Sequence, residues 1–212
     1  MVSHSQAPFS DAESRDAGWI ARAAEQRGGP DYAELIAAQR VLQDRVAGAV
    51  LPPELVPVVT AKLRELAALL GPHQAPETER WDGWRPDLPG RAMPLLPPYV
   101  IEEYDRNEVR GHVTFGRFYL GGGAAAHGGS HGLLFDDVMG HLAGMAGGMC
   151  RTAYLTINYR RITPMDVELR FDCRLDNVEG RKRFVSARLY NPSGEVVADC
   201  TALFLRLLPG QQ

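Results

Sequence analysis

The residues best suited to chemistry lie in one stretch past the middle of the chain, AHGGSHGLLFDDVMGHLAGMAGG. His127, Gly128 and Gly129 open it, and the carboxylates Asp136 and Asp137 follow nine and ten residues after the histidine. A carboxylate can act as a general base on water or as a nucleophile. Glycine N–H groups at the start of a helix favour a developing negative charge. The stretch therefore combines a carboxylate with a group that polarises an electrophile.

The same stretch has the periodicity of a helix. Leu134, Val138, Leu142 and Met145 recur every three or four residues, which is helical spacing. We expect Ser130 to be the N-cap, because serine is favoured there and two glycines precede it.

One stripe of this helix carries little side-chain volume. It consists of Gly132, Asp136, Gly140 and Gly144. Each interior glycine costs a helix about 1 kcal/mol relative to alanine, so the stripe predicts close approach of another segment or a ligand. Asp137 points about 100° away and shares a row with His141, for which an exposed carboxylate–imidazole pair is expected. Asp136 is therefore the preferred catalytic acid.

Length and composition indicate an ordinary globular protein. The chain has 212 residues, 45% of them hydrophobic and 23% charged, with a net charge of −3. This charge gives no reason to expect nucleic acid as a partner. Three cysteines are too few and odd in number for a disulfide framework. The sequence shows neither a secretory signal pattern nor a membrane-spanning run, so we expect a cytoplasmic protein.

Residues 1–98 are expected to form a helical arm and a linker. After a short helix around Trp19, one helix is predicted from Asp31 to the prolines at 52–53 and a second over 54–70. Residues 72–98 are rich in proline and tryptophan and read as an irregular linker. Residues 1–75 hold seven basic and nine acidic side chains, which disfavours DNA binding.

Residues 99–208 are expected to form the main domain. Strand material precedes the central helix, and four alternating runs follow it. These runs are 152–160, 166–175, 183–190 and 195–205. Short turns between them indicate an antiparallel meander. One long apolar helix with such a meander predicts an α+β fold, in which a curved sheet wraps around the helix.

Three segments resemble the hotdog-fold acyl-CoA thioesterases of the PaaI-like type, and most of all the branch of thioesterase superfamily members four and five. They are HGGSHGLLFDDVMG, MAGGMCRTAYLTINYRR and DNVEGRKRFVS, and GHVTFGRFYLGG matches more weakly. Their order and spacing match those of the family over a little under half of the chain. The resemblance does not extend to residues 1–90.

The resemblance implies a role for each motif residue. Asp136 stands at the position of the catalytic carboxylate, and Thr152 at the position that helps to hold the attacking water from across a dimer interface. The backbone N–H of Gly129 would polarise the thioester carbonyl, with His127 close by. Gly121 departs from the pattern, because some relatives carry asparagine there. Asp136 and Gly129 are expected from one subunit and Thr152 from the other.

Further residues are expected to contact the substrate. Gly128 and Ser130 belong to the motif. Four basic residues are candidates for the coenzyme A phosphates, since arginine binds phosphate in a bidentate way, although solvated surface charges are an equal alternative. These four are Arg160, Arg161, Arg181 and Lys182. No metal or cofactor beyond the coenzyme A of the substrate is expected, because His127 should precede the helix that carries His131, which spoils a common ligand face.

The sequence thus predicts a homodimeric or tetrameric acyl-CoA thioesterase acting on a fatty or aromatic acyl group. Whether the acid acts as a general base or as a nucleophile stays open, with the base preferred. Two alternatives remain on the same fold: a non-catalytic acyl-CoA sensor and an acyl-CoA hydratase or dehydratase.

Overall fold

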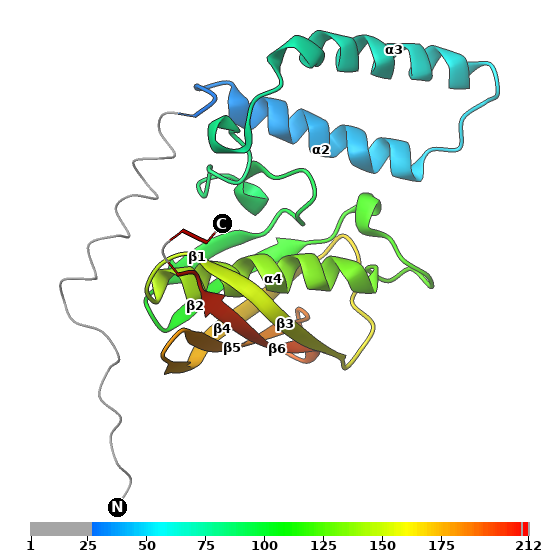
Figure 1. The fold of residues 1–212 in the computed structure, drawn as a ribbon. Coiled ribbons are helices and arrows are strands. Elements are labelled where there is room, and N and C mark those ends of the chain that lie inside the picture. The colour runs from blue at the N-terminus through cyan, green and yellow to red at the C-terminus, as the bar shows by residue number, and fades with distance from the viewer. Residues whose placement is uncertain (1–26, 209, 212) are drawn as a thin grey trace, which may run out of the picture.

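The computed structural model describes residues 27–208 and 210–211, so the short helix expected around Trp19 lies outside the described residues. The two predicted arm helices are confirmed as α2 (Tyr32–Gly48) and α3 (Leu55–Leu70). Between them lie the prolines at 52–53, which cannot continue a helix. The arm forms a hairpin that projects from the remainder of the molecule (Figure 1).

The linker after the hairpin contains three short 3₁₀ helices, η2 (Gly71–His73), η3 (Glu77–Glu79) and η4 (Pro89–Ala92). Tyr32 and Ile36 of α2 form a small hydrophobic cluster with Ala92, against which Leu88 packs. The Arg40 side chain of α2 donates hydrogen bonds to three linker carbonyls. The linker therefore holds α2 by both apolar and polar contacts.

Within the described residues, six strands form one antiparallel sheet that wraps around the long helix α4 (Gly128–Met145) (Figure 1). The strands are β1 (Val100–Tyr104), β2 (Glu108–Thr114), β3 (Cys150–Tyr159), β4 (Glu168–Glu179), β5 (Lys182–Tyr190) and β6 (Val196–Arg206). Their order across the sheet is β1-β2-β4-β5-β6-β3. A further 3₁₀ helix, η5 (Arg117–Tyr119), precedes α4. This arrangement is the hotdog fold, and the predicted fold class is confirmed.

The alternation of the strands explains how the sheet covers α4. On β4 the side chains of Leu169, Phe171 and Cys173 are buried, while the charged residues between them face outward. Leu134 and Val138 of α4 are fully buried in the same core. One apolar face of the sheet therefore packs on the apolar face of α4.

Strand β3 lies at one edge of the sheet and pairs with β6 alone among the described strands. The predicted meander of four consecutive strands is therefore wrong for its first strand, because β2 and not β3 lies beside β4. The register of β3 shifts between Thr152 and Tyr154, which marks a β-bulge at Ala153. A bulge re-aims neighbouring side chains and breaks the simple alternation.

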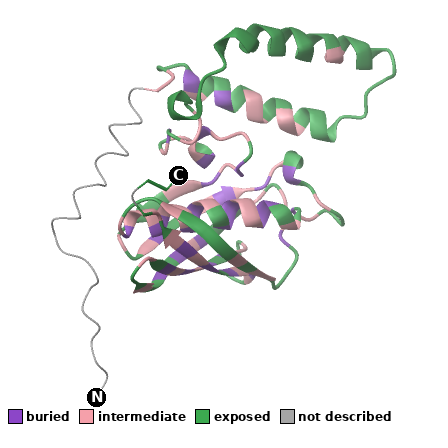
Figure 2. Ribbon diagram, viewed as in Figure 1, coloured by how far each residue is buried: buried purple, intermediate pink, exposed green. Residues whose placement is uncertain are grey.

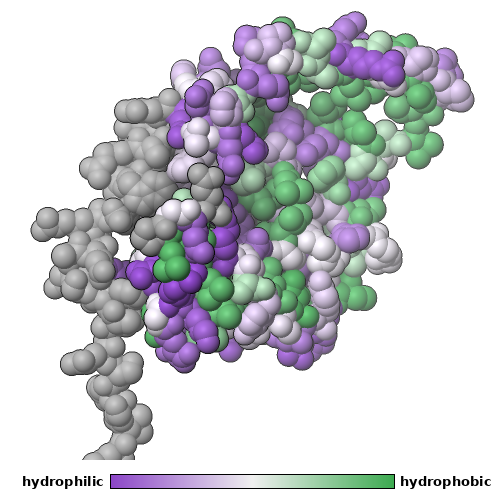
Figure 3. Space-filling model, viewed as in Figure 1, coloured by the Kyte–Doolittle hydropathy of each residue, from purple (hydrophilic) through white to green (hydrophobic). Residues whose placement is uncertain are grey.

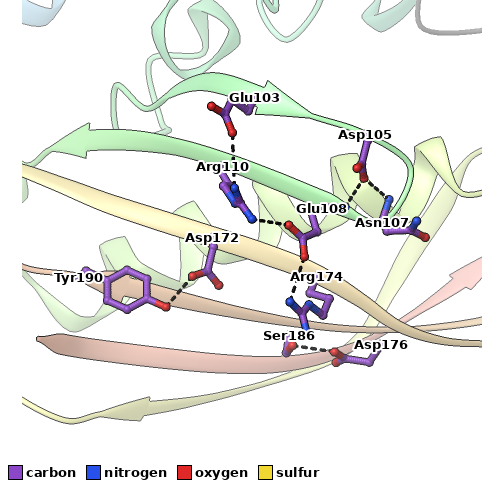
Figure 4. A network of polar contacts seen from close by, with 10 residues as sticks. All are labelled: Glu103, Asp105, Asn107, Glu108, Arg110, Asp172, Arg174, Asp176, Ser186 and Tyr190. Carbon is purple, nitrogen blue, oxygen red and sulfur yellow. Dashed lines mark hydrogen bonds and ion pairs between the residues drawn. The ribbon is translucent and has the colours of Figure 1, made fainter. Parts of the chain in front are cut away.

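The face of the sheet that points away from α4 is polar. Figure 4 shows Glu108 between Arg110 and Arg174, and the Tyr190 hydroxyl directed at Asp172. A groove of about 680 Å³ lies on this face, lined largely by charged residues of β1, β2 and β4. It includes none of the residues predicted for the active site.

The hairpin buries little of its apolar surface. None of the sixteen residues of α3, all of which are described, is buried, and α2 buries Tyr32 and Ile36 alone (Figure 2). Hydrophobic residues consequently reach the surface of the hairpin (Figure 3). No described helix combines the length and the apolar character that crossing a bilayer requires.

Candidate active site

The chain enters α4 through the His-Gly-Gly motif. His127 has extended backbone angles and is the N-cap, and its ring Nδ1 accepts the Gly129 N–H at 3.0 Å. Ser130 is not the N-cap that the sequence predicted. It lies buried in the first turn, where its hydroxyl donates to the carbonyl of His127 at 2.6 Å. An imidazole nitrogen therefore occupies the place that we expected a serine oxygen to take.

His131, which lies in the first turn of α4, is buried, with 1% of its surface exposed. Its ring stacks on Phe115, and its Nε2 lies 2.8 Å from the Thr163 hydroxyl. Its Nδ1 lies 3.3 Å from the carbonyl of His127, which can only accept, so Nδ1 carries the proton and Nε2 accepts from Thr163. Burial lowers the pKa of His131. The i,i+4 spacing from His127 was the one sequence signal for this contact.

Two further contacts fix the beginning of α4. The Tyr159 hydroxyl at the end of β3 donates to the Gly128 carbonyl at 2.9 Å. A side chain at Gly121 would have its Cβ 2.9 Å from the Cα of His127. This close approach favours glycine at position 121, which offers no side-chain amide to bind a carbonyl.

Asp136 and Thr152 form the polar pair of the site. The Thr152 hydroxyl donates to Oδ1 of Asp136 at 2.7 Å, and both residues are exposed. The bulge next to Thr152 lies where β3 passes Asp136. The two residues meet within one chain, so the expectation that Thr152 would reach Asp136 from a partner subunit is wrong.

The glycine stripe of α4 faces the sheet. A Cβ at Gly140 would lie 3.3 Å from the Phe204 ring, and one at Gly132 would lie 3.7 Å from Ile157. The predicted close approach is therefore confirmed at Gly140, where β6 approaches, whereas the distance at Gly132 to Ile157 of β3 is an ordinary van der Waals contact. At Gly144 a Cβ would meet no described atom within 4 Å, so close approach does not explain that glycine.

The acid and the polarising amide are well separated along the helix. Asp136 lies seven residues after Gly129, which corresponds to about 10 Å along the axis at 1.5 Å per residue. A near-attack geometry requires reacting atoms about 3–3.5 Å apart. The Asp136 carboxylate and the Gly129 N–H of one chain are therefore poorly placed to act on the same carbonyl group.

Asp137 has a structural environment that the sequence did not reveal. Its carboxylate accepts two hydrogen bonds from the Arg91 guanidinium and one from the Tyr99 hydroxyl. Burial, followed by the charge of Asp137, raises the pKa of Tyr99 well above its ordinary value. The expected exposed pair with His141 is wrong, because Asp137 is partly buried and bound to the linker. Arg91 adopts a left-handed backbone at φ 53°, which no local sequence signal predicts for arginine.

The four basic candidates do not form one cluster. Arg160 and Arg161 follow β3 and pair with Asp199 and Glu195. Lys182 begins β5, which lies beside the other end of β6, and Arg181 directly precedes it. Arg160 and Arg181 thus flank opposite ends of a sheet about 30 Å long, at about 3.3 Å per residue. One chain cannot close all four around a single phosphate group.

Among the described residues, no group of three or more histidine, cysteine, aspartate or glutamate side chains is arranged to hold a metal ion. The site is therefore built from the Asp136–Thr152 pair and the amides at the start of α4. This combination suits attack of water on an activated carbonyl.

No protein-family model matches the sequence. Among curated proteins, it is 30% identical over 109 residues to acyl-coenzyme A thioesterase THEM4 of Xenopus laevis, which covers 50% of this chain and 49% of that protein. The Bos taurus protein of the same name is 31% identical over 114 residues. The chain spans about half the length of these curated relatives.

A crystallised protein described as a thioesterase superfamily protein aligns with a TM-score of 0.72 and 28% identity. The alignment covers 84% of this chain and 96% of that protein. Residues 99–212 alone cannot supply this coverage, so the similarity extends well into the arm and linker. The match confirms the predicted relationship and reaches further than the sequence motifs did.

Proposed function

Because the chain belongs to the thioesterase superfamily, we propose that it hydrolyses an acyl-coenzyme A thioester to the free acid and coenzyme A. The observation that carries the proposal is the exposed Asp136 carboxylate, held at 2.7 Å by Thr152, on a helix that begins with His-Gly-Gly. The THEM4 proteins, which are named as acyl-coenzyme A thioesterases, support this substrate class.

In the proposed mechanism, Asp136 acts as the general base. Thr152 donates to Oδ1, so Oδ2 remains to accept a proton from water. The water oxygen attacks the carbonyl carbon, and the C–S bond breaks as the tetrahedral intermediate collapses. The coenzyme A thiolate leaves and takes up a proton. Direct attack by the carboxylate, giving an anhydride that water then cleaves, is the alternative route.

The carbonyl oxygen would be polarised by the amides at the start of α4. Donors placed at a developing oxyanion are worth about 3 kcal/mol or more. Since the Gly129 N–H of one chain lies about 10 Å from its own Asp136 along the axis, we assign this amide to a second subunit in a homodimer. The His127 ring, which accepts the Gly129 N–H at 3.0 Å, would turn away or share that donor when substrate binds.

The acyl group is proposed to be fatty or aromatic. Arg160 and Arg161 lie beside the beginning of α4, where Tyr159 reaches Gly128, so they are better placed than Arg181 and Lys182 for the phosphates of the same substrate. The cytoplasm is the proposed compartment, since each of the three cysteines, all of them described, is free.

The test is a thiol-release assay with hexanoyl-, palmitoyl- and benzoyl-coenzyme A. Wild-type protein is expected to release coenzyme A from at least one of them. Asp136→Asn should lower kcat by at least about a thousandfold, since the base is removed while its shape is kept. Thr152→Val should have a smaller effect, because the carboxylate remains.

Two results would contradict the proposal. Tight binding of acyl-coenzyme A without thiol release would favour the sensor alternative. Near-normal turnover by Asp136→Asn would show that Asp136 is not the general base. Circular dichroism of that variant would verify that the protein is folded.

A further inference from the structure

We propose that α2 of the arm is a positioning element of the active site and that it acts through Asp44. This inference rests on the proposed thioesterase function for its catalytic readout. Its physical basis is a continuous series of short contacts from the Asp44 carboxylate to His127 at the beginning of α4.

The first contact joins the arm to the loop before the motif. Oδ1 of Asp44 accepts the backbone N–H of Phe118 at 2.7 Å. Phe118 lies in η5, whose first amides lack partners within the helix. The loop backbone passes so close to the carboxylate that a Cβ at Gly116 would lie 2.6 Å from it. Asp44 therefore caps η5 from another element.

The second contact joins the loop to the motif. The carbonyl of Tyr119, next to Phe118, accepts the N–H of His127 at 2.8 Å. The Tyr119 hydroxyl donates to the Leu96 carbonyl at 2.6 Å, which fixes the same residue from its other end. A shift of η5 would therefore move His127, whose ring holds the Gly129 N–H.

A separate set of contacts keeps α2 in place when Asp44 is changed. The Arg40 guanidinium donates to the carbonyls of Pro89, Met93 and Leu96 at 3.0–3.1 Å. Tyr32 and Ile36 are buried against the linker. A substitution at Asp44 thus removes the hydrogen bond to η5 and leaves the attachment of α2 to the linker intact, so such a variant is expected to fold.

The catalytic experiment compares three variants of the full chain with the same acyl-coenzyme A substrates. Asp44→Ala removes the acceptor and should lower kcat by about tenfold to a hundredfold, since a misplacement of about 1 Å can cost that much. Its KM should change little. Asp44→Asn keeps an oxygen acceptor of the same shape and should restore most of the activity. Arg45→Ala alters the exposed neighbour on α2 and serves as the matched control.

A second readout does not depend on catalysis. Hydrogen exchange measured by mass spectrometry should show faster exchange at the Phe118 and His127 amides in Asp44→Ala than in Asp44→Asn or Arg45→Ala. Unchanged kcat and unchanged exchange in Asp44→Ala would overturn the inference. If wild-type protein hydrolyses no thioester, the proposed function fails, whereas the exchange result still decides whether Asp44 holds the loop.

Discussion

Two adjacent carboxylates on α4 have opposite surroundings. Asp136 is exposed and bound by one threonine hydroxyl, whereas Asp137 accepts hydrogen bonds from Arg91 and Tyr99 in a partly buried position. Removing a partner from a charged hydrogen bond costs about 1.5–3 kcal/mol. The two residues should therefore affect different properties of the protein.

Asp137→Asn is expected to destabilise the fold by about 2 kcal/mol, because Arg91 would lose its counter-charge in a partly buried site. For a chain of this size this corresponds to a decrease in melting temperature of about 4–8 °C. The kcat should stay within a few fold of wild type. Thermal unfolding of Asp136→Asn is the matched control, since that variant should melt as wild type does. If Asp137→Asn instead lost activity and melted at the wild-type temperature, Asp137 would be the catalytic acid and the assignment of the two aspartates would be wrong.

His131 should make the stability depend on pH. Burial lowers its folded-state pKa below the ordinary value of 6.5. Above that value the ring is neutral in both states. As the pH falls below it, the unfolded chain binds the proton first, so stability is lost between 6.5 and the lower folded value. His141, whose pKa burial also lowers, acts with the same sign.

The measurement is the melting temperature from pH 8 to pH 5 at constant ionic strength. Wild type should lose stability over the acidic half of this range. His131→Gln and His141→Gln should each make the melting temperature depend less steeply on pH, because each substitution removes the uptake of about one proton on unfolding. This holds whatever the effect of the substitution on absolute stability. A profile that both variants leave unchanged would exclude the two rings as its source.

At the scale of elements, sequence periodicity predicted the helices and strands correctly wherever the local structure depends on neighbouring residues along the chain. The presence of α2, the boundaries of α3 to within one residue, the strand alternation of β4 and the helix that carries Asp136 were all predicted. These features follow from local spacing and from turn residues. The four-residue glycine stripe also predicted that something would approach α4.

Features that depend on distant segments were not predicted. The burial of His131 requires Thr163 and Phe115, which lie on other elements. The Arg91–Asp137 pair requires a left-handed backbone at Arg91 and at its neighbour Ala92. The in-chain contact of Thr152 with Asp136 depends on the β-bulge. Each arises from packing that no local pattern specifies.

At the scale of the whole molecule, the proposed function assigns the two halves of the site to different subunits of a homodimer. If Asp136 of one chain acts with the Gly129 amide of another, each dimer has two composite sites. A chain that lacks its acid can then still donate an intact helix start to its partner. If both groups came from one chain, a chain that lacks its acid could not contribute to an active site in its partner.

Mixing two inactive variants tests this arrangement. Asp136→Asn lacks the acid, and Gly129→Pro lacks the N–H at a first-turn position where proline is tolerated. In a mixed dimer one of the two sites has both groups, so equal amounts should recover about a quarter of wild-type activity after subunit exchange, as expected for a two-fold dimer. Asp136→Asn mixed with Asp136→Asn,Gly129→Pro is the control and should recover none. If the first mixture recovers no activity, Asp136 and the Gly129 N–H act from the same chain and the proposed division between subunits is wrong.

The exposed helix α3 gives the molecule two separate levels of cooperativity. A segment that buries no residue contributes little to the unfolding free energy of the sheet. Melting or cleavage of α3 would therefore remove that helix and leave the hotdog domain folded, with α2 still held by the linker. The loop at 49–54, where Val50 is 99% exposed, is accordingly an accessible place for an inserted tag or label.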